Sequence, residues 1–459
     1  MSEYDVIIAG GGNAGLCAAL SASDEGANVL LVERSPMWRR GGNSRHTRDL
    51  RYAHEEPDVW ASAAYPVADF LADLKSVTDP ERPDLAELMV LESQTLPAWM
   101  EEHGVRWQSP INGTLHLHTN RFFLGGGKTL INSYYDAALR RGVEIRYGTS
   151  VHALEISNSH CSAIHLEQDG KRETAEARSV IVTSGGLEAN HAWLAETWGD
   201  GATNFIVRGT PDNDGSLLLT LLEHGAARTG SDLFHCVGVD ARSPRFDGGI
   251  VTRVDSIPFG IVVNKNGIRF HDEGEDAWPK CYAQWGQMIA KQPDQIVYSI
   301  FDSQSWGLFI PPVYPPFVGD SLEQLLSQLD LDAPEALRTI ESFNAAVDDA
   351  QSFDPSRPDG RAAPGIEPPR SNWARAIDRP PFFAYPLRPG LTFTYTGVEV
   401  DETARVVRTD GTTFANVFAA GEVMAGNILT RGYLAGVGLT IGSVFGRIAG
   451  RQAAEAASA

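Results

Sequence analysis

Three glycines near the start of the chain have the spacing of a turn that binds phosphate. Gly10, Gly12 and Gly15 satisfy the pattern G-x-G-x-x-G, and Glu33 follows about 20 residues later. In this pattern the first glycine permits a tight turn, and the second lets the backbone approach a pyrophosphate. The third allows close helix–strand packing, and the later carboxylate can bind a ribose. These residues therefore indicate a dinucleotide site.

The segments around these residues have the patterns that such a site requires. Residues 4–9 form a short apolar run rich in β-branched side chains, which is typical of a strand buried on both faces. Residues 16–26 predict a helix, and residues 28–33 predict a second strand ending at Glu33. A strand, glycine turn, helix and strand in this order begin a dinucleotide-binding α/β domain, which also places Asn13, Ala14 and Arg34 at the cofactor.

Composition narrows the class of protein. The 459 residues predict two domains, and a formal net charge of −21 argues against nucleic acid or an anionic membrane as partner. The four cysteines form no C-x-x-C pair, so neither a haem attachment site nor an iron–sulfur run is expected. No signal peptide and no apolar run of membrane-spanning length is found, and we expect a cytoplasmic protein.

The order of elements predicts a discontinuous architecture. A cofactor domain is expected from residues 1–236 and 366–459, with a capping domain at 237–365 inserted between its two parts. Within the cap, strands are expected at Val251, 261–263 and 296–300, and one helix over 322–349. A long helix is expected at 433–454.

Three features favour FAD over NAD. The glycine fingerprint lies at the N-terminus, and an apolar strand in mid-chain ends at Ser184 and Gly185. Near the C-terminus, an apolar run reaches Gly421 and Glu422 before a final helix opens at Gly436, Gly438 and Leu439. The N–H groups and positive dipole end of that helix would then face the flavin ring.

Over essentially its whole length, the chain resembles the fumarate reductase and succinate dehydrogenase flavoproteins. Within that family, the runs 39–48, 270–276 and 421–429 most resemble tricarballylate dehydrogenases. The resemblance implies a Rossmann-like FAD-binding domain (GR2-type) with an inserted α+β cap. It also implies removal of two hydrogens across a C–C bond beside carboxylates, with hydride passing to flavin N5. Gly42, Asn43 and Ser44 would lie at the flavin, and Ser44 replaces the histidine that succinate dehydrogenase links to FAD, so non-covalent FAD is expected.

The same resemblance assigns substrate ligands. Thr252 would bind a carboxylate, and Arg253 stands where fumarate reductases have an acid, which would add a contact for a third carboxylate. Arg431 takes the place of the second carboxylate clamp. Thr394 and His46 are further candidates, and His46 belongs to a basic cluster that could face the pyrophosphate or an anionic substrate.

The family's acid/base residues are missing. Its proton-transferring arginine falls on Ala277, and its histidine falls near Thr392 or Phe393. A dehydrogenase still needs a base, and the candidates that the sequence offers are Tyr433, Lys280, His271 and His46. Tyr433 comes first because a guanidinium at Arg431 could lower the pKa of its phenol.

Other interpretations stay open. The same fold serves 3-ketosteroid dehydrogenases and a flavoprotein that acts on a tetrapyrrole polycarboxylate, and a non-catalytic electron-transfer subunit is a further alternative. His116 and His118 lack a third ligand, so no metal site is expected. Without a haem motif or second nucleotide fold, reduced FAD would need a separate electron acceptor.

Overall fold

The computed structural model describes residues 4–109 and 118–458 of the chain. Its first sheet has a parallel core of five strands in the order β19–β9–β1–β2–β6. β1 (Tyr4–Ala9), β2 (Val29–Glu33) and the final residues of β9 (Lys171–Val182) are almost fully buried, as expected for strands covered on both faces. β6 (Glu144–Tyr147) and β19 (Thr413–Ala419) flank them, and β18 (Arg405–Val407) adds an antiparallel edge.

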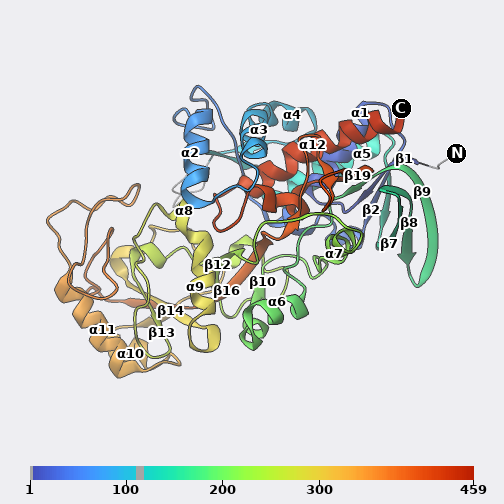
Figure 1. Cartoon of the computed structure of the whole chain (residues 1–459). Coiled ribbons are helices and arrows are strands. Elements are labelled where there is room, and N and C mark those ends of the chain that lie inside the picture. Colours follow the sequence, from blue (N-terminus) through green and yellow to red (C-terminus); the bar gives the residue numbers. More distant parts are fainter. Residues whose placement is uncertain (1–3, 110–117, 459) are drawn as a thin grey trace.

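The two ends of the chain build one domain. α1 (Asn13–Asp24) and α12 (Val437–Ser458) pack against each other over the sheet, beside α5 (Gly126–Arg140) (Figure 1). A Cβ on Gly446 of α12 would lie 2.5 Å from the carbonyl oxygen of Ala14. The glycines of α12 thus let these helices approach until their backbones touch.

Shorter elements surround this domain. A ribbon of β7 (Thr149–Ser157) and β8 (His160–Gln168) extends β9, and α7 (Ser216–Glu223) packs on β7. The remaining elements of this part are α2 (Val67–Val77), α3 (Pro83–Ser93), α4 (Leu96–Glu102), α6 (His191–Trp198), β3 (Asp49–Arg51), β4 (Trp107–Gln108), β5 (Asn120–Phe123), β11 (Arg228–Thr229) and β17 (Gly397–Val398).

A second lobe is built on another sheet, seen at lower left in Figure 1. Its long central strand β16 (Phe382–Thr394) pairs with β12 (Phe234–Asp240), β14 (Val297–Asp302), β15 (Phe317–Gly319) and β10 (Ile206–Val207), while β13 (Ile261–Asn264) pairs with β14. α8 (Trp278–Cys281), α9 (Trp285–Ala290), α10 (Leu322–Leu326) and α11 (Ala333–Ala346) complete it. This sheet draws strands from both sides of the 237–365 segment.

Two local expectations for the second lobe are wrong. Val251 lies in a 3₁₀ turn, Ile250–Thr252, that follows Gly249 at φ 66°. The helix expected over 322–349 is two helices, because Asp332 caps a new helix by accepting a hydrogen bond from the Glu335 amide (3.0 Å).

Candidate functional site

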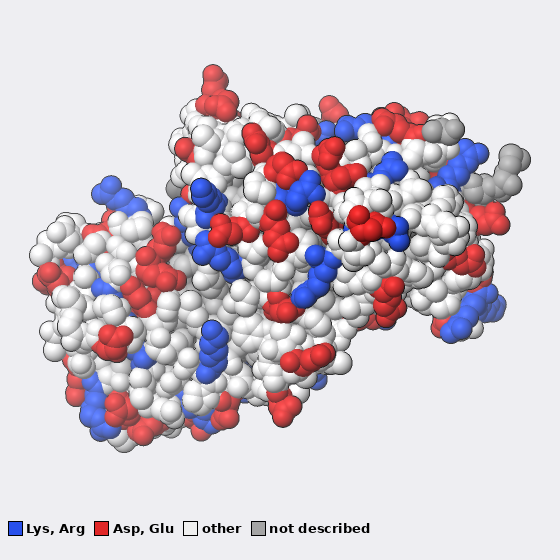
Figure 2. Space-filling view, viewed as in Figure 1, with Lys and Arg blue, Asp and Glu red and all other residues white. Residues whose placement is uncertain are grey.

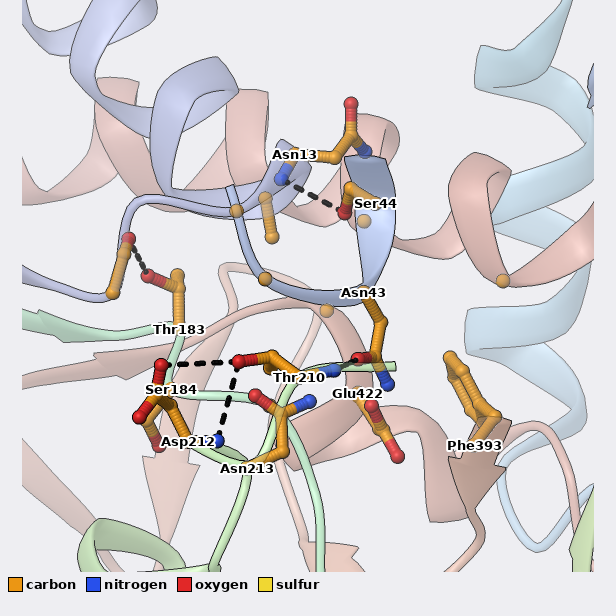
Figure 3. A pocket seen from close by; sticks show the side chains of 18 of the residues that line it. Asn13, Asn43, Ser44, Thr183, Ser184, Thr210, Asp212, Asn213, Phe393 and Glu422 are labelled. Atoms are coloured by element: carbon orange, nitrogen blue, oxygen red, sulfur yellow. Dashed lines mark hydrogen bonds between the residues drawn. The ribbon is translucent and has the colours of Figure 1, made fainter. Parts of the chain in front are cut away.

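A cavity of about 420 Å³ opens at the carboxyl ends of β1 and β2, where ligands bind in sheets of this kind (Figure 3). Sixteen of the seventeen cofactor residues expected from the sequence line it: Gly10, Gly12, Asn13, Ala14, Glu33, Arg34, Gly42, Asn43, Ser44, Ser184, Gly185, Gly421, Glu422, Gly436, Gly438 and Leu439. Gly15 is the exception, and a Cβ there would lie 1.9 Å from the carbonyl oxygen of Gly10. Gly15 thus lies behind the cavity wall, where its lack of a side chain lets the helix pack closely on the glycine turn.

The glycine turn is locked to distant segments. Gly10 has φ 117°, and a Cβ there would lie 2.4 Å from the carbonyl oxygen of Thr183. The backbone amide of Asn13 donates to Ser44 Oγ (3.1 Å), as Figure 3 shows, and its side-chain amide donates to the carbonyl oxygen of Leu439 (3.2 Å). Segments far apart in sequence therefore meet at the start of α1.

Glu33 has the position that ribose binding needs. Its carboxylate lines the cavity at the end of β2 and accepts hydrogen bonds from the amides of Ser35 (2.8 Å) and Gly41 (3.2 Å). Burial raises the pKa of Glu33 despite these bonds. Arg34 points outward and pairs with Asp214 (2.6 Å). A carboxylate keeps acceptor capacity beyond two bonds, so Glu33 can still receive hydroxyl groups of a ligand.

Features of this cavity fit a dinucleotide such as FAD. Two helix N-termini, those of α1 and α12, meet its wall, and helix N-termini favour phosphate and electron-rich groups. Ser184 Oγ is buried without a hydrogen-bond partner among the described residues, and its residue lines the cavity. A bound cofactor would supply the missing partner.

Two carboxyl groups form a buried pair, and one of them, Glu422, lines the cavity. Glu422 Oε1 accepts from the amide of Thr394 (2.6 Å), and Glu188 Oε1 accepts from the side-chain amides of Asn213 (2.9 Å) and Asn43. Neither carboxyl group has an ion pair among the described residues. Burial and the proximity of Glu188 raise the pKa of Glu422 well above its usual range, and burial also raises that of Glu188.

Three arginines meet in the cavity. Arg48, Arg208 and Arg253 all line it. Arg253 pairs with Asp255 (2.7 Å), whereas Arg208, as far as the described residues go, donates only to the Thr392 hydroxyl (3.1 Å) and to a backbone carbonyl. The Arg48 side chain has neither a hydrogen bond nor an ion pair with any described residue. Burial and neighbouring charge lower the pKa of Arg48 and of Arg208 to about 10, which leaves both cationic at neutral pH.

An aromatic cluster adjoins these arginines. Tyr282, His235 and Tyr433 line the same cavity, and the guanidinium of Arg253 lies 4.8 Å from the centre of the Tyr282 ring. The His235 and Tyr433 rings lie 4.2 Å apart between centroids. Tyr433 Oη accepts from the Gly438 amide (3.0 Å), and burial raises the pKa of Tyr433, the reverse of the direction expected beside Arg431.

The other sequence-predicted ligands lie in different surroundings. Arg253, Tyr433 and His46 line the cavity, and His46 Nε2 bonds to Asp247 Oδ1 (2.9 Å). The rest lie outside the lining. Thr252 donates to the Gly249 carbonyl, Thr394 contacts Glu422, Lys280 pairs with Asp73, His271 pairs with Glu275, and Arg431 is 54% exposed with Asp79 4.0 Å away.

Sequence reasoning missed Arg208, His235, Tyr282 and Glu188. His235 had a detectable signal, because it is a histidine within the buried strand Phe234–Asp240. Arg208 had none, since it follows a two-residue strand whose partner, β16, is far away in sequence. His116 lies outside the described residues. Among those described, no cluster of three or more His, Cys, Asp or Glu side chains is arranged to hold a metal ion. Likewise, no described helix is long and apolar enough to cross a membrane.

The fold and cavity together define a flavoprotein of the Rossmann-like class. A family model described as FAD binding domain matches residues 5–439. The chain therefore belongs to this family, in the fumarate reductase group of FAD-dependent oxidoreductases, and its cofactor is FAD. The expectations of family, cofactor and fold class are confirmed.

Two fumarate reductase relatives cover nearly the whole chain, and a steroid dehydrogenase covers two thirds of it. NADH:fumarate oxidoreductase of Klebsiella pneumoniae (strain 342) is 26% identical over 99% of this chain, which spans only 48% of that protein. Probable fumarate reductase Ifc3 of Shewanella frigidimarina (strain NCIMB 400) is 26% identical over 98% of this chain and 74% of that protein. A 3-oxosteroid 1-dehydrogenase of Mycobacterium tuberculosis (strain ATCC 25618 / H37Rv) is 25% identical over 67% of this chain and 59% of that protein.

Solved structures share the fold. The open conformation of a flavocytochrome c3 fumarate reductase matches with a TM-score of 0.76 and 23% identity over 99% of this chain and 78% of that one. A 3-ketosteroid-Δ4-(5α)-dehydrogenase from Rhodococcus jostii RHA1 matches with a TM-score of 0.74 and 22% identity, over 98% of this chain and 96% of that one. Likeness at this level establishes architecture and leaves the substrate open.

Proposed function

We propose that the protein removes or adds two hydrogens across a C–C bond of a small polycarboxylate, with tricarballylate-like acids as first candidates. The observation that carries this proposal is the cationic character of the cavity at Arg48 and Arg208. Arg208 is buried and Arg48 is half-buried in a protein of net charge −21, and neither guanidinium has a carboxylate hydrogen-bonded to it within the described residues.

The unpaired arginines of the cavity indicate how many carboxylates its ligand carries. A buried cation is costly unless it is paired, so each of Arg48 and Arg208 favours one carboxylate of a ligand. Arg253 already pairs with Asp255 through one terminal nitrogen, and its Nε is buried with no hydrogen-bond partner in the part of the chain that the structure describes. A third carboxylate could share that guanidinium. Asp49 and Asp255 offset part of this positive charge. The three guanidiniums therefore favour two ligand carboxylates and can accommodate a third.

The cofactor and the side chains have separate tasks. When bound, FAD supplies a two-electron acceptor or donor for hydride; Asn13, Glu33, Ser44, Ser184 and Gly438 are among the residues that would hold it. Arg48, Arg208 and Arg253 bind and orient the acid, which converts a freely diffusing anion into a fixed one. They also favour negative charge that develops beside a carboxylate when a proton leaves.

The proposal includes non-covalently bound FAD and a separate electron acceptor, and the charge of the cavity argues against the alternative functions. Non-covalent FAD is consistent with Ser44, because a serine stands here in place of the histidine that succinate dehydrogenase links to FAD. The Ser44 hydroxyl oxygen accepts a hydrogen bond from the Asn13 amide. A separate electron acceptor completes the cycle. A ketosteroid carries no charge that could compensate Arg48 and Arg208, and a cavity with three arginines would be unnecessary in a non-catalytic electron carrier.

Anaerobic titration of the purified yellow protein tests the proposal. Tricarballylate or succinate is expected to bleach the visible absorbance of oxidised flavin, whereas a 3-ketosteroid is not. Bleaching by the steroid alone would overturn the proposed substrate class.

Arginine variants then test the binding site. Arg208→Gln and Arg48→Gln should each raise KM about 10- to 100-fold, the cost of one charge-assisted hydrogen bond. Arg338→Gln, on the exposed surface of α11, is the matched control. Arg431→Gln tests whether the second carboxylate ligand is Arg431, as the family resemblance implies, or Arg208, as the cavity favours. Loss of turnover in Arg431→Gln together with normal kinetics of Arg208→Gln would contradict the arrangement proposed here.

A further inference from the structure

His235 is a polar residue held in an apolar strand. It lies in β12 (Phe234–Asp240), every residue of which is buried, and it is itself 5% exposed. Opposite it, β16 is irregular: His235 pairs with Phe393 and Cys236 pairs with Leu391, which leaves Thr392 without a paired residue. Such a bulge re-aims the side chains beside it. His235, Thr392 and Phe393 all line the cavity.

The ring of His235 has one nitrogen in use and one unused. Nε2 lies 3.3 Å from Tyr282 Oη, within hydrogen-bonding distance. Nδ1 is buried and has no hydrogen-bond partner in the described part of the chain. A neutral imidazole whose Nε2–H donates to Tyr282 carries its free lone pair on Nδ1. A buried acceptor without a partner is costly, so its retention at a cavity wall is a mark of function.

We propose that His235 is the proton acceptor in oxidation of the substrate, and the proton donor in the reverse direction. This assignment rests on the proposed function, because it needs a substrate C–H bond beside a carboxylate at the arginines. One C–H bond breaks and its proton moves to the imidazole, while its electron pair forms the C=C bond. The hydrogen on the neighbouring carbon leaves as hydride, and FAD is the two-electron oxidant that accepts it.

Competing groups in the cavity are less suited to this step. Burial raises the pKa of Tyr282 to about 12 and also raises that of Tyr433, so both phenols stay protonated at neutral pH. His46 is engaged by Asp247. Lys280 pairs with Asp73 and does not line the cavity. The carboxyl group of Asp49 also lines the cavity, but the charges of Arg48, Arg253 and Arg51 oppose its protonation. His235 supplies a neutral imidazole beside the arginines.

The charges facing His235 keep it unprotonated until substrate arrives. Burial lowers the pKa of His235 well below its usual range, and Arg208 and Arg253 lower it further. Its other neighbours, Tyr282 and Tyr433, are uncharged at neutral pH. Substrate carboxylates at the arginines would offset the two positive charges and make the ring more basic. The free enzyme is thus ready to accept a proton, and the bound acid strengthens the base that attacks it.

His235→Gln in the FAD-loaded protein tests the proposal, with Tyr433→Phe as its competitor and His165→Gln, on β8 outside the cavity, as control. Each variant is assayed by anaerobic flavin bleaching with whichever acid or ketone the wild type oxidises. Failure of every polycarboxylate with the wild type therefore rejects the proposed function, while the base is still examined with the active compound. We expect His235→Gln to lose about 10²- to 10⁴-fold in the bleaching rate while substrate binding, followed by the flavin spectrum, changes only a few-fold.

Two further readouts separate catalysis from structure. The acid limb of the wild-type kcat/KM profile should lie below pH about 6.5, the ordinary imidazole value, and should disappear in His235→Gln. Imidazole added to His235→Ala should restore part of the rate. Retention of the acid limb in His235→Gln, or a larger loss in Tyr433→Phe with the limb abolished there, would overturn the assignment.

Discussion

Glu188 and Glu422 show how a residue can be costly to the fold and still belong in a site. Both carboxyl groups are buried side by side and interact with each other, and they accept from amide or hydroxyl donors of Asn43, Asn213 and Thr394. Like charges at contact distance in a poorly solvated wall cannot both stay ionised. We therefore expect the pair to share one proton at neutral pH. Glu422 lines the cavity, so the pair lies beside the cofactor.

Glu188→Gln should stabilise the protein at neutral pH. The folded-state pKa of the pair is raised above 4.5, so the stability that the pair contributes is complete below that pH and declines as pH rises through the folded pKa. Glutamine can accept from Asn213 and donate to Glu422, and it removes this decline of about 1.4 kcal/mol per pH unit. Urea unfolding of both proteins with excess FAD between pH about 5 and 8 measures the slopes, and a slope unchanged by the substitution would contradict a shared proton.

At the scale of single residues, the sequence predicts the residues that lie together in short motifs and misses those that only the fold brings together. The cofactor residues belong to short motifs in which Gly10, Gly12 and Gly15 have a local conformational duty, so their spacing alone identifies them. The substrate side is assembled from residues that only the tertiary fold brings together. Arg48, Arg208 and His235 come from three separate segments, and no spacing in the sequence relates them.

Close backbone approach joins the first and the last helix of the protein. α1 and α12, from opposite ends of the chain, approach closely because Gly442, Gly446 and Gly450 recur at every fourth position of α12. This contact fixes both helix N-termini relative to the glycine turn. The sequence identified α12 but started it too early, since Gly436 at φ 85° separates Tyr433 from the helix that begins at Val437.

Gly446→Ala should therefore weaken the cofactor domain. Its Cβ would lie 2.5 Å from the Ala14 carbonyl oxygen and 3.0 Å from Cys17 Cβ, so the helices must separate. We expect a loss of about 1–3 kcal/mol, the usual cost of overpacking, which outweighs the better helix propensity of alanine. Thermal melting followed by circular dichroism measures it. Arg451→Ala, exposed on the same helix, should leave the melting temperature nearly unchanged, and equal melting of both variants would refute close packing as the cause.

In the second lobe, a buried charge network ties a loop to the sheet. Glu273 is fully buried and accepts from Arg269 (2.6 Å), Arg370 (3.0 Å) and the Val262 amide (2.8 Å). Although burial opposes its charge, the two guanidiniums hold the pKa of Glu273 below its usual range. Arg370 in turn donates to the Gly260 carbonyl (3.0 Å), which connects residues far apart in sequence.

Removal of Glu273 should be far more damaging than removal of a surface acid. Glu273→Ala leaves two buried guanidiniums without their counter-ion and should cost about 3–5 kcal/mol. Glu335→Ala breaks the exposed pair with Arg338 and should cost less than about 1 kcal/mol. Urea unfolding followed by tryptophan fluorescence compares the two variants, and similar losses in both would show that the network adds no stability.

The whole molecule sets opposite charges at its surface and in its cavity. Acidic side chains are spread over both lobes on the face shown in Figure 2, in keeping with the net charge of −21. Beneath that surface, the cavity gathers Arg48, Arg208 and Arg253. An anionic substrate thus meets long-range repulsion first and short-range attraction afterwards. Composition gives the net negative charge, and the sequence already offers Arg253 as a carboxylate ligand. The placement of Arg208 beside it appears only when the cap strands and the cofactor domain are brought together.

This arrangement predicts an unusual salt dependence. Surface charges are screened within about 10 Å at 0.1 M salt and about 30 Å at 0.01 M, while buried charges are screened much less. Added salt should therefore weaken the repulsion more than the binding at Arg48 and Arg208. We expect kcat/KM for a polycarboxylate to rise several-fold as NaCl increases from about 0.01 to 0.1 M, measured by anaerobic flavin bleaching at subsaturating substrate. A monocarboxylate should show a smaller rise because it carries less charge. A fall in kcat/KM over this range would mean that the arginines also steer the substrate from a distance, and that the cavity, rather than the acidic surface, dominates the field along its approach.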